Sequence, residues 1–437
     1  MKETLQTRLH KRQLKPVNPV LYWILQRITD VLNLAVKPKF EYKAYPGKCD
    51  GPFILISNHA SRNDYLFTAP ACRPKRLNYV VGYNEFLRFP LSIVLKLANA
   101  VPKKNFVSDM YTIKQIMKII RAGGNVCFMP EGMSSITGMC QPVMPGGGKL
   151  LKKLGVPVYY TRISGGYLTF TKHCLDQRNG RTEVLVDQMF TPEELKQLTV
   201  EEIEDRMNRL IAHDDYIWNK ENQVKFNGKG KMARNLDTLL YMCPECGAMY
   251  EMECGDNHMT CKACGMRVDI DDRYNITYDL TAVDSSKEYF READKLPKLV
   301  SDWTILERNK AAETVRKEGF TFSEHVRIGM LPEYRQLVGK ATSIICGDGT
   351  LSLDKEGLHF RGTAYDKPYE FDLSPSAVPT FGMCTDISRF YTFAAGDFVE
   401  FYPDDNDVLR WDHLVEEMHR YCGGKWQNTE YRHNSDQ

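Results

Sequence analysis

Residues 51–66, GPFILISNHASRNDYL, restrict the fold of this chain more than any other segment. The apolar run at 53–56 is too short for a helix and follows Gly-Pro, so it predicts a buried strand of the parallel type. His59 then lies at the carboxyl end of that strand, where open α/β sheets bind ligands. With Asp64 close by, it has the orienting partner that a general base needs. The alternative for an isolated pair is a loop histidine with a structural hydrogen bond.

Short apolar strands and amphipathic helices alternate over residues 53–214. This alternation predicts an α/β domain with a mostly parallel sheet and helices on its faces. Asn58-His59 with Asp64, followed later by FMPEGMSS at 128–135, resembles the two signature motifs of the glycerolipid acyltransferases, the family of bacterial 1-acylglycerol-3-phosphate acyltransferase. The resemblance covers roughly residues 21–214. One position departs from the motif, because Ser134 replaces an arginine that usually contacts phosphate.

The resemblance implies transfer of a fatty acyl group from acyl-CoA or acyl-acyl carrier protein to the free hydroxyl of a lysophospholipid. The favoured acceptor is 1-acylglycerol-3-phosphate, which would give phosphatidic acid, and no catalytic cofactor is implied. His59 would be the general base, and Asp64 would orient its ring. The positions expected to bind substrate are Asn58, Lys103, Lys104, Pro130, Glu131 and Gly132.

Three alternatives stay open at this point. Lys103 and Lys104 have the equal alternative of being a solvated pair. The loss of the motif arginine at Ser134 allows an acceptor other than lysophosphatidate. A function of another class, a non-catalytic lipid-binding scaffold, is disfavoured by the intact His59 and Asp64. Serines near His59 are not expected to act as nucleophiles, because no Gly-x-Ser-x-Gly turn frames them.

Two Cys-x-x-Cys pairs, each followed by glycine, occur in the second half of the chain. They consist of Cys243, Cys246, Cys261 and Cys264. Four thiolates in two such turns suit tetrahedral Zn²⁺ and leave no open coordination position, so the pattern predicts a structural zinc ribbon. Redox chemistry is the less favoured alternative, because a single pair would suffice for it and the βαβ context is missing.

The amino-terminal residues combine basic charge with an amphipathic helix. Residues 1–15 carry five Lys or Arg against one Glu, and the helix after Pro19 contains Tyr22, Trp23 and several Leu and Ile. This pattern is typical of an interfacial anchor on an anionic membrane surface. The equal alternative is a helix whose apolar face covers the domain core. The resemblance favours the membrane, because these enzymes use acceptors that lie in the bilayer.

The net charge and the cysteine count restrict the binding partners and the cellular compartment that we expect. The formal net charge of 437 residues is only +2, which gives no reason to expect nucleic-acid binding. The thirteen cysteines are an odd number and no cleavable leader is apparent, so a reducing interior is predicted. No segment has the roughly 20 apolar residues of a membrane span. We therefore expect a cytoplasmic protein, peripheral on the inner face of the membrane.

A helix is expected from Ser301 to about Val315, and after it the periodicity changes from helical to alternating. Short strands are expected at 342–346, 350–353, 357–361, 369–373, 389–393 and 398–402, followed by one amphipathic helix. A meander ending in a helix resembles the small all-β pleckstrin-homology-like domains. The expected layout is a basic arm and interfacial helix (1–36), an acyltransferase domain (37–218), a basic linker (219–236), a zinc ribbon (237–280), the pleckstrin-homology-like domain (300–424) and a polar tail (425–437).

Overall fold

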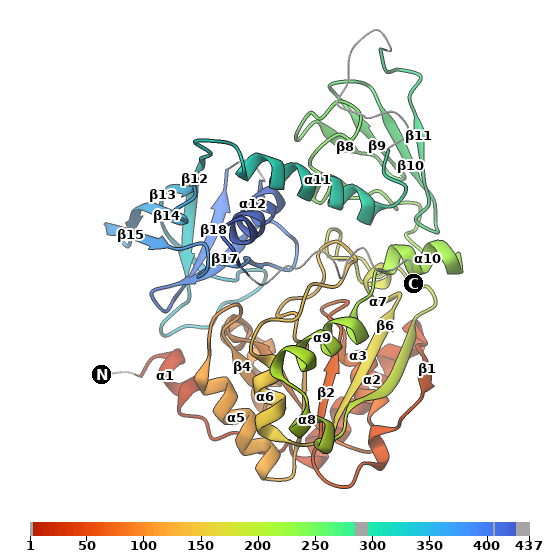
Figure 1. The fold of residues 1–437 in the computed structure, drawn as a ribbon, viewed down its shortest axis with the longest axis vertical. Helices are drawn as coiled ribbons and strands as arrows, with labels where there is room; N and C mark the ends of the chain where they lie inside the picture. Colours follow the sequence, from red (N-terminus) through yellow and green to blue (C-terminus); the bar gives the residue numbers. More distant parts are fainter. Residues whose placement is uncertain (1–2, 285–295, 405–406, 425–437) are drawn as a thin grey trace.

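The computed structural model describes residues 3–284, 296–404 and 407–424. Figure 1 shows three units: an α/β unit (residues 3–222) in the lower half, a cysteine-rich unit (236–284) at the upper right, and a C-terminal β unit (300–424) at the upper left. The tail expected at 425–437 lies outside the described residues. Within the described part, no helix is both long enough and apolar enough to cross a membrane.

The α/β unit contains a seven-stranded, mostly parallel sheet in the order β1-β7-β6-β2-β5-β3-β4. Only the β6–β7 pair is antiparallel. The central strand β2 is buried on both faces and pairs with β5 and β6. This confirms the expected mixed, mostly parallel sheet. The strands are β1 (Lys39–Tyr42), β2 (Ile54–Ser57), β3 (Leu77–Gly82), β4 (Val101–Lys103), β5 (Asn125–Phe128), β6 (Val158–Ser164) and β7 (Glu183–Phe190).

Helices cover the two faces of this sheet. Helix α5 buries Ile116, Ile119 and Ile120 against the sheet, and the capping boxes at Thr191 and Thr199 start α8 and α9. The helices are α3 (Tyr65–Ala71), α4 (Leu91–Leu97), α5 (Met110–Arg121), α6 (Gly147–Leu154), α7 (Gly166–Thr169), α8 (Pro192–Gln197), α9 (Val200–Ile211) and α10 (Asp215–Asn222), with the 3-10 turns η1 (Pro46–Lys48) and η2 (Tyr83–Leu87).

The amino-terminal helix α2 (Pro19–Val36) turns its apolar side to solvent. Trp23 is 58% exposed and Leu34 is 71% exposed, whereas Gln26 and Thr29 are buried. The inner face combines the apolar Tyr22 and Val36, which are buried in the core, with polar groups such as Asn33, whose Nδ2 donates to the Leu66 carbonyl of α3 at 2.8 Å. Most apolar side chains of α2 therefore face solvent, against the alternative that its apolar face covers the core. The preceding basic segment is not an extended arm, since it folds into helix α1 (Leu5–His10).

The cysteine-rich unit contains a four-stranded antiparallel sheet in the order β11-β10-β9-β8. Its elements are η3 (Leu236–Thr238), β8 (Met252–Cys254), β9 (His258–Cys261), β10 (Arg267–Ile270) and β11 (Ile276–Asp279). The preceding segment, 219–236, was expected to be a linker, but its first residues complete α10. Phe226 and Met232 in it are buried in the core shared with the α/β unit, so it is a packed connection.

The C-terminal β unit consists of helix α11 (Val300–Val315), a seven-stranded antiparallel sheet and a closing helix α12 (Val408–Tyr421) that packs on α11. The sheet order is β15-β14-β13-β12-β18-β17-β16. The strands are β12 (Phe322–Met330), β13 (Ile344–Leu353), β14 (Leu358–Ala364), β15 (Lys367–Leu373), β16 (Gly382–Met383), β17 (Phe390–Ala394) and β18 (Asp397–Pro403). Strands followed by a helix were expected; the pleckstrin-homology-like identity stays a prediction.

Two differences from the expected strands have physical reasons. The strands expected at 342–346 and 350–353 are one strand, β13, because Gly347 and Gly349 pass close to β14 instead of forming a turn. A Cβ atom at Gly347 would lie 1.9 Å from the Thr363 carbonyl oxygen. The nine-residue strand β12 was not expected, because its apolar alternation is broken by Glu324 at an inward position, where the carboxylate accepts the Trp411 indole N–H at 2.7 Å.

The three units share their hydrophobic cores. One cluster joins Met133 and Ile136 of the α/β unit to the cysteine-rich unit and to the β unit. A second cluster packs Tyr83 and Phe86 of η2 against Tyr391 and Phe398 of the β17–β18 hairpin. The C-terminal β unit therefore lies directly on the loops at the carboxyl edge of the parallel sheet (Figure 1).

Candidate active site and metal centre

His59 and Asp64 form a close pair directly after β2. His59 Nδ1 lies 2.8 Å from Asp64 Oδ2. The His59 side chain is 25% exposed, whereas that of Asp64 is 2% exposed. A carboxylate that accepts the Nδ1 proton leaves Nε2 as the ring's proton-accepting atom. The pair thus has the geometry that a general base and its orienting group need.

Asp64 is held on its other side by Ser61. Its Oδ1 accepts the Ser61 backbone N–H at 2.9 Å and the Ser61 hydroxyl at 3.0 Å. Burial raises the pKa of Asp64, and the bonds from His59 and Ser61 oppose that rise. The Ser61 hydroxyl is therefore engaged with the carboxylate. Ser57 is fully buried, so neither serine is presented as a nucleophile.

Glu131 joins the second motif to the first. Its Oε1 accepts the His59 backbone N–H at 2.6 Å, and its Oε2 accepts the Gln141 backbone N–H at 2.7 Å. The side chain is fully buried, which raises the pKa of Glu131 to about 7 against the lowering effect of these bonds. Both oxygens are thus bound to backbone amides, and Glu131 fixes the His59 loop rather than lining an open pocket.

Asn58 and Pro130 are also buried beside the pair. The Asn58 side chain bonds both backbone groups of Ile163, donating to its carbonyl at 2.9 Å and accepting its N–H at 2.7 Å. The Pro130 carbonyl accepts the Met144 N–H at 2.9 Å. Asn58 was expected to contact substrate. The geometry favours a structural role instead, because its side-chain amide bonds the His59 loop to β6.

The loop after Glu131 is shaped by Gly132 and bonds the histidine loop again. Gly132 has a φ of +83°, which a residue with a Cβ rarely adopts. The Ser135 backbone N–H donates to the His59 carbonyl at 2.7 Å. This backbone bond and the bond from the Glu131 side chain therefore both join this segment to His59.

A lysine that the sequence motifs do not include lies beside Ser134. Lys172 Nζ donates to the Ser134 carbonyl at 3.4 Å. Burial lowers the pKa of Lys172 to about 8. Ser134 is the position where the resemblance expects arginine, and the ammonium of the buried Lys172 bonds the backbone carbonyl at that position. No pattern in the sequence indicated this, because Lys172 follows α7, far from both motifs.

Lys103 and Lys104 lie at the end of β4, where the resemblance expects a basic group. Lys103 Nζ donates to the Val107 carbonyl at 2.8 Å and to the Lys104 carbonyl at 2.5 Å. Lys104 Nζ donates to the Gly396 carbonyl of the C-terminal β unit at 3.0 Å and lies over the rings of Tyr83 and Phe393. An ammonium has three donors, so each lysine retains at least one. The alternative of a purely solvated pair is wrong.

The C-terminal β unit covers the side of the site opposite the sheet. The Met383 backbone N–H lies 3.1 Å from Met133 Sδ. Asn105 Nδ2 donates to the Tyr391 hydroxyl oxygen at 3.0 Å. These contacts place β16 and β17 on the loops that follow β5 and β4. No local pattern indicated this arrangement, because a motif carries no information about packing between distant segments.

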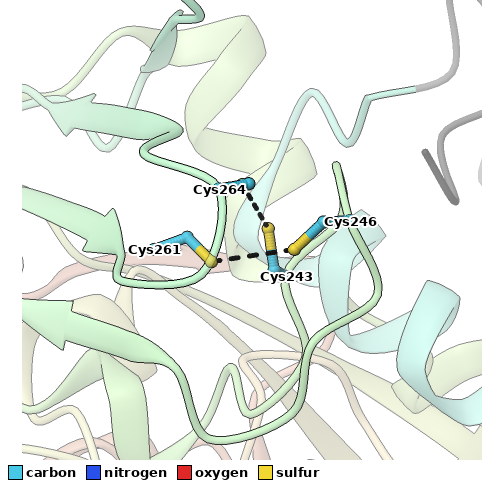
Figure 2. Close-up of side chains that lie close together, drawn as sticks. All are labelled: Cys243, Cys246, Cys261 and Cys264. Carbon is cyan, nitrogen blue, oxygen red and sulfur yellow. Dashed lines mark hydrogen bonds between the residues drawn. The ribbon is translucent and has the colours of Figure 1, made fainter. Parts of the chain in front are cut away.

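The four cysteines meet in the cysteine-rich unit (Figure 2). Their sulfur atoms all lie within 4.8 Å of one another, and the Cys243–Cys264 and Cys246–Cys261 sulfur pairs are 3.8 Å apart. A sulfur tetrahedron around Zn²⁺ with bonds of ~2.3 Å has edges of ~3.8 Å. The cluster therefore has the size and donor type for a zinc ion.

Helix α11 supports the first cysteine turn from behind. Trp303 Nε1 donates to the Met242 carbonyl at 2.8 Å, and Glu307 Oε1 accepts the Met242 N–H at 2.9 Å. Both side chains are buried. The residue before Cys243 is thus fixed by a helix of the next unit, which couples the metal-type cluster to the C-terminal β unit.

Comparison with known proteins matches part of the α/β unit to one family model. Residues 33–164 match the family model described as Acyltransferase, a segment that includes His59, Asp64 and Glu131. The solved structure of the 1-acyl-sn-glycerophosphate (LPA) acyltransferase PlsC from Thermotoga maritima is similar, at 14% sequence identity and a TM-score of 0.38. The match covers 44% of this chain and 76% of that chain. A search of curated proteins found no match.

Proposed function

We propose that the acyltransferase domain at residues 33–164 transfers a fatty acyl group from acyl-CoA or acyl-acyl carrier protein to the hydroxyl of a lysophospholipid, with 1-acylglycerol-3-phosphate as the favoured acceptor. The observation that carries the proposal is the 2.8 Å His59–Asp64 pair inside the matched segment. An alcohol is a weak nucleophile near neutral pH, so its attack on a thioester needs a base at its proton.

In the proposed reaction His59 Nε2 takes the acceptor's hydroxyl proton as the oxygen attacks the thioester carbonyl. Asp64 holds the Nδ1 proton and stabilises the imidazolium that forms. The C–S bond then breaks, and the proton leaves with the thiol. Transfer is direct and needs no acyl-enzyme, in keeping with the burial of Ser57 and the bonding of Ser61 to Asp64.

The acceptor's phosphate is assigned to the lysines around the loops. Lys103, Lys104 and Lys172 supply positive charge, although none forms the planar two-bond contact of the motif arginine. Changing Lys172 to Gln should raise KM for a phosphate-bearing acceptor more than for a neutral monoacylglycerol. An equal change for both acceptors would favour the alternative that this enzyme acylates another acceptor.

The decisive experiment is product analysis by mass spectrometry. Purified chain is offered a panel of lysolipids with each thioester donor, and the His59→Ala variant serves as the control. Acylated product that depends on His59 supports acyl transfer, and the panel names the acceptor. Absence of product with every pair, while the chain still binds lipid vesicles, would favour a non-catalytic lipid-binding protein.

We also infer that the protein works as a peripheral protein on an anionic membrane surface, on the cytoplasmic face. Helix α2 carries the inference, because its exposed apolar side chains include Trp23 and Ile28, 58% and 51% exposed. Changing both to Ser should weaken sedimentation with anionic liposomes and spare the fold, since neither side chain is packed. Unchanged liposome binding would contradict this role for α2.

The four-cysteine cluster is proposed to bind one structural Zn²⁺ in a zinc ribbon. The sulfur spacing supports this assignment, and a closed set of four thiolates gives zinc no position for substrate. Metal analysis of the purified chain tests it. Less than one zinc per chain in metal-replete protein, or redox cycling of the cysteines, would overturn the assignment.

A further inference from the structure

A cavity outside the acyl-transfer site lies between α1, η2 and α4. Its volume is about 230 Å³. Its apolar wall includes Leu5, Leu9 and Phe86. Pockets that enclose whole drug-sized ligands measure roughly 300–1,000 Å³, so this cavity suits a head group rather than a complete lipid.

Three cationic side chains line the same cavity: Arg8, Arg12 and Lys96. Burial lowers the pKa of Lys96, and the positive charges of Arg12 and Arg8 lower it further, so the three groups lie within electrostatic reach of one another. Across the described ranges 3–284, 296–404 and 407–424, no carboxylate forms an ion pair with any of them. Like charges gathered without a counter-charge are stabilised by a bound anion.

Arg12 is held in place at the wall of the cavity. Its Nη2 donates to the Lys96 carbonyl at 2.8 Å and to Asn99 Oδ1 at 3.5 Å. These bonds fix the guanidinium against α4, next to the ammonium of Lys96, so the two positive charges cannot move apart. A fixed pair of like charges favours a bound anion.

The surroundings of the cavity favour a lipid as the source of such an anion. Lys96 belongs to α4, whose side chains Ile93, Val94 and Leu97 are between 43% and 50% exposed. An apolar helix surface next to a cationic cavity is complementary to the interface of a bilayer, where phosphate groups lie next to acyl chains.

We propose that the cavity between α1 and α4 binds the phosphate of an anionic membrane phospholipid, with α4 in contact with the acyl region. Arg8, Arg12 and Lys96 bind the phosphate oxygens. The wall formed by Leu5, Leu9 and Phe86 packs against the first carbons of the lipid. This site goes beyond acyl transfer, because it involves neither His59 nor Asp64.

The test compares two charge-matched double variants of the full chain. Arg8→Gln with Lys96→Gln removes two cavity cations and no side-chain hydrogen bond that the structure records. Lys153→Gln with Arg209→Gln removes two exposed cations of α6 and α9. Binding is measured by sedimentation with phosphatidylcholine vesicles, with and without phosphatidic acid. Each cation near anionic lipid is expected to raise the affinity for vesicles about fivefold. Loss of the two cavity cations should therefore weaken the binding that depends on phosphatidic acid roughly 30-fold. Loss of the two control cations should weaken it by less than about threefold.

A single variant, a His59 variant and inorganic phosphate serve as controls for this binding experiment. Arg8→Gln alone, on an exposed side chain, should weaken binding about fivefold without affecting folding. His59→Ala should bind vesicles like the parent chain, so a failure of the acyl-transfer proposal is seen separately. Equal losses in the two double variants would overturn the site, because diffuse surface charge would explain them. If inorganic phosphate raised the unfolding temperature as much as phosphatidic acid vesicles did, the ligand would be a soluble phosphate, and the lipid assignment would be wrong.

Discussion

The histidine pair and the cysteine cluster are both polar groups held by tight loops, but they are built in opposite ways. His59 is partly exposed and its position depends on three strands, because Asn58 bonds β6 and Glu131 follows β5. The cysteines come from two short turns, and Cys243 and Cys261 are fully buried. A reacting group must leave one atom accessible and have its orientation fixed from a distance. A structural metal site needs only a closed set of protein ligands, with no position left for substrate.

The largest effect expected from this comparison follows removal of the histidine. His59→Ala should lower kcat/KM by about 100- to 10,000-fold, because general-base assistance is worth that much. The unfolding temperature should change little, since the ring is partly exposed. Steady-state kinetics and thermal unfolding of the same preparation measure both. Turnover near that of the parent chain would contradict the proposed mechanism.

The next largest effect concerns the orienting carboxylate. Asp64→Asn should lower kcat/KM by about 100-fold or more, because the amide no longer fixes the tautomer or stabilises the imidazolium. Ser61→Ala is the matched control, since it removes one hydrogen bond to Asp64 and keeps the charge. Similar losses in the two variants would show that Asp64 acts only through loop packing.

Loss of the proposed zinc ion should lower the stability of the chain strongly and its activity only weakly. Chelation, or Cys261→Ser, should release zinc, expose thiols to a thiol reagent and lower the unfolding temperature, because metal binding is part of the folding free energy of such sites. Acyl transfer at low temperature should stay within a few-fold of the parent value. Activity that followed zinc content while the fold stayed intact would mean that the metal is catalytic.

The smallest effect is expected when the hydrogen bond between α11 and the first cysteine turn is removed. Trp303→Phe removes the bond to the Met242 carbonyl and leaves that acceptor unpaired, at an expected cost of about 1–3 kcal/mol in the free energy of unfolding. Zinc content and kcat should stay unchanged. Denaturant titration and metal analysis check this. Zinc loss in this variant would show that α11 is needed to assemble the site.

Local patterns indicated the residues that meet in each cluster, but they did not indicate the contacts between distant segments. His59 and Asp64 lie within one short segment, and so do the two cysteines of each turn, so spacing alone places these residues close together. The bond from Glu131 to the His59 backbone joins residues from different strands, and no local pattern encodes it. Lys172 reaches Ser134 for the same reason.

Helix α2 and strand β13 show two further limits of local patterns. The helical period of α2 predicted an apolar stripe but not its direction, because Gln26 and Thr29 face the protein and Trp23 faces solvent. In β13 the pair Gly347 and Gly349 has the composition of a turn. These glycines instead permit a close approach of β14, which depends on the partner strand and not on the local sequence.

The packing of Met133 and Ile136 beneath the C-terminal β unit affects how the chain folds during synthesis. Their cover is completed by α12, near the end of the chain. At about 5–20 residues per second, a ribosome needs on the order of tens of seconds to make the intervening segment. During that time the nascent α/β unit displays an uncovered apolar loop next to His59. A stop codon before α12 should therefore yield a product that aggregates, because this apolar loop stays uncovered.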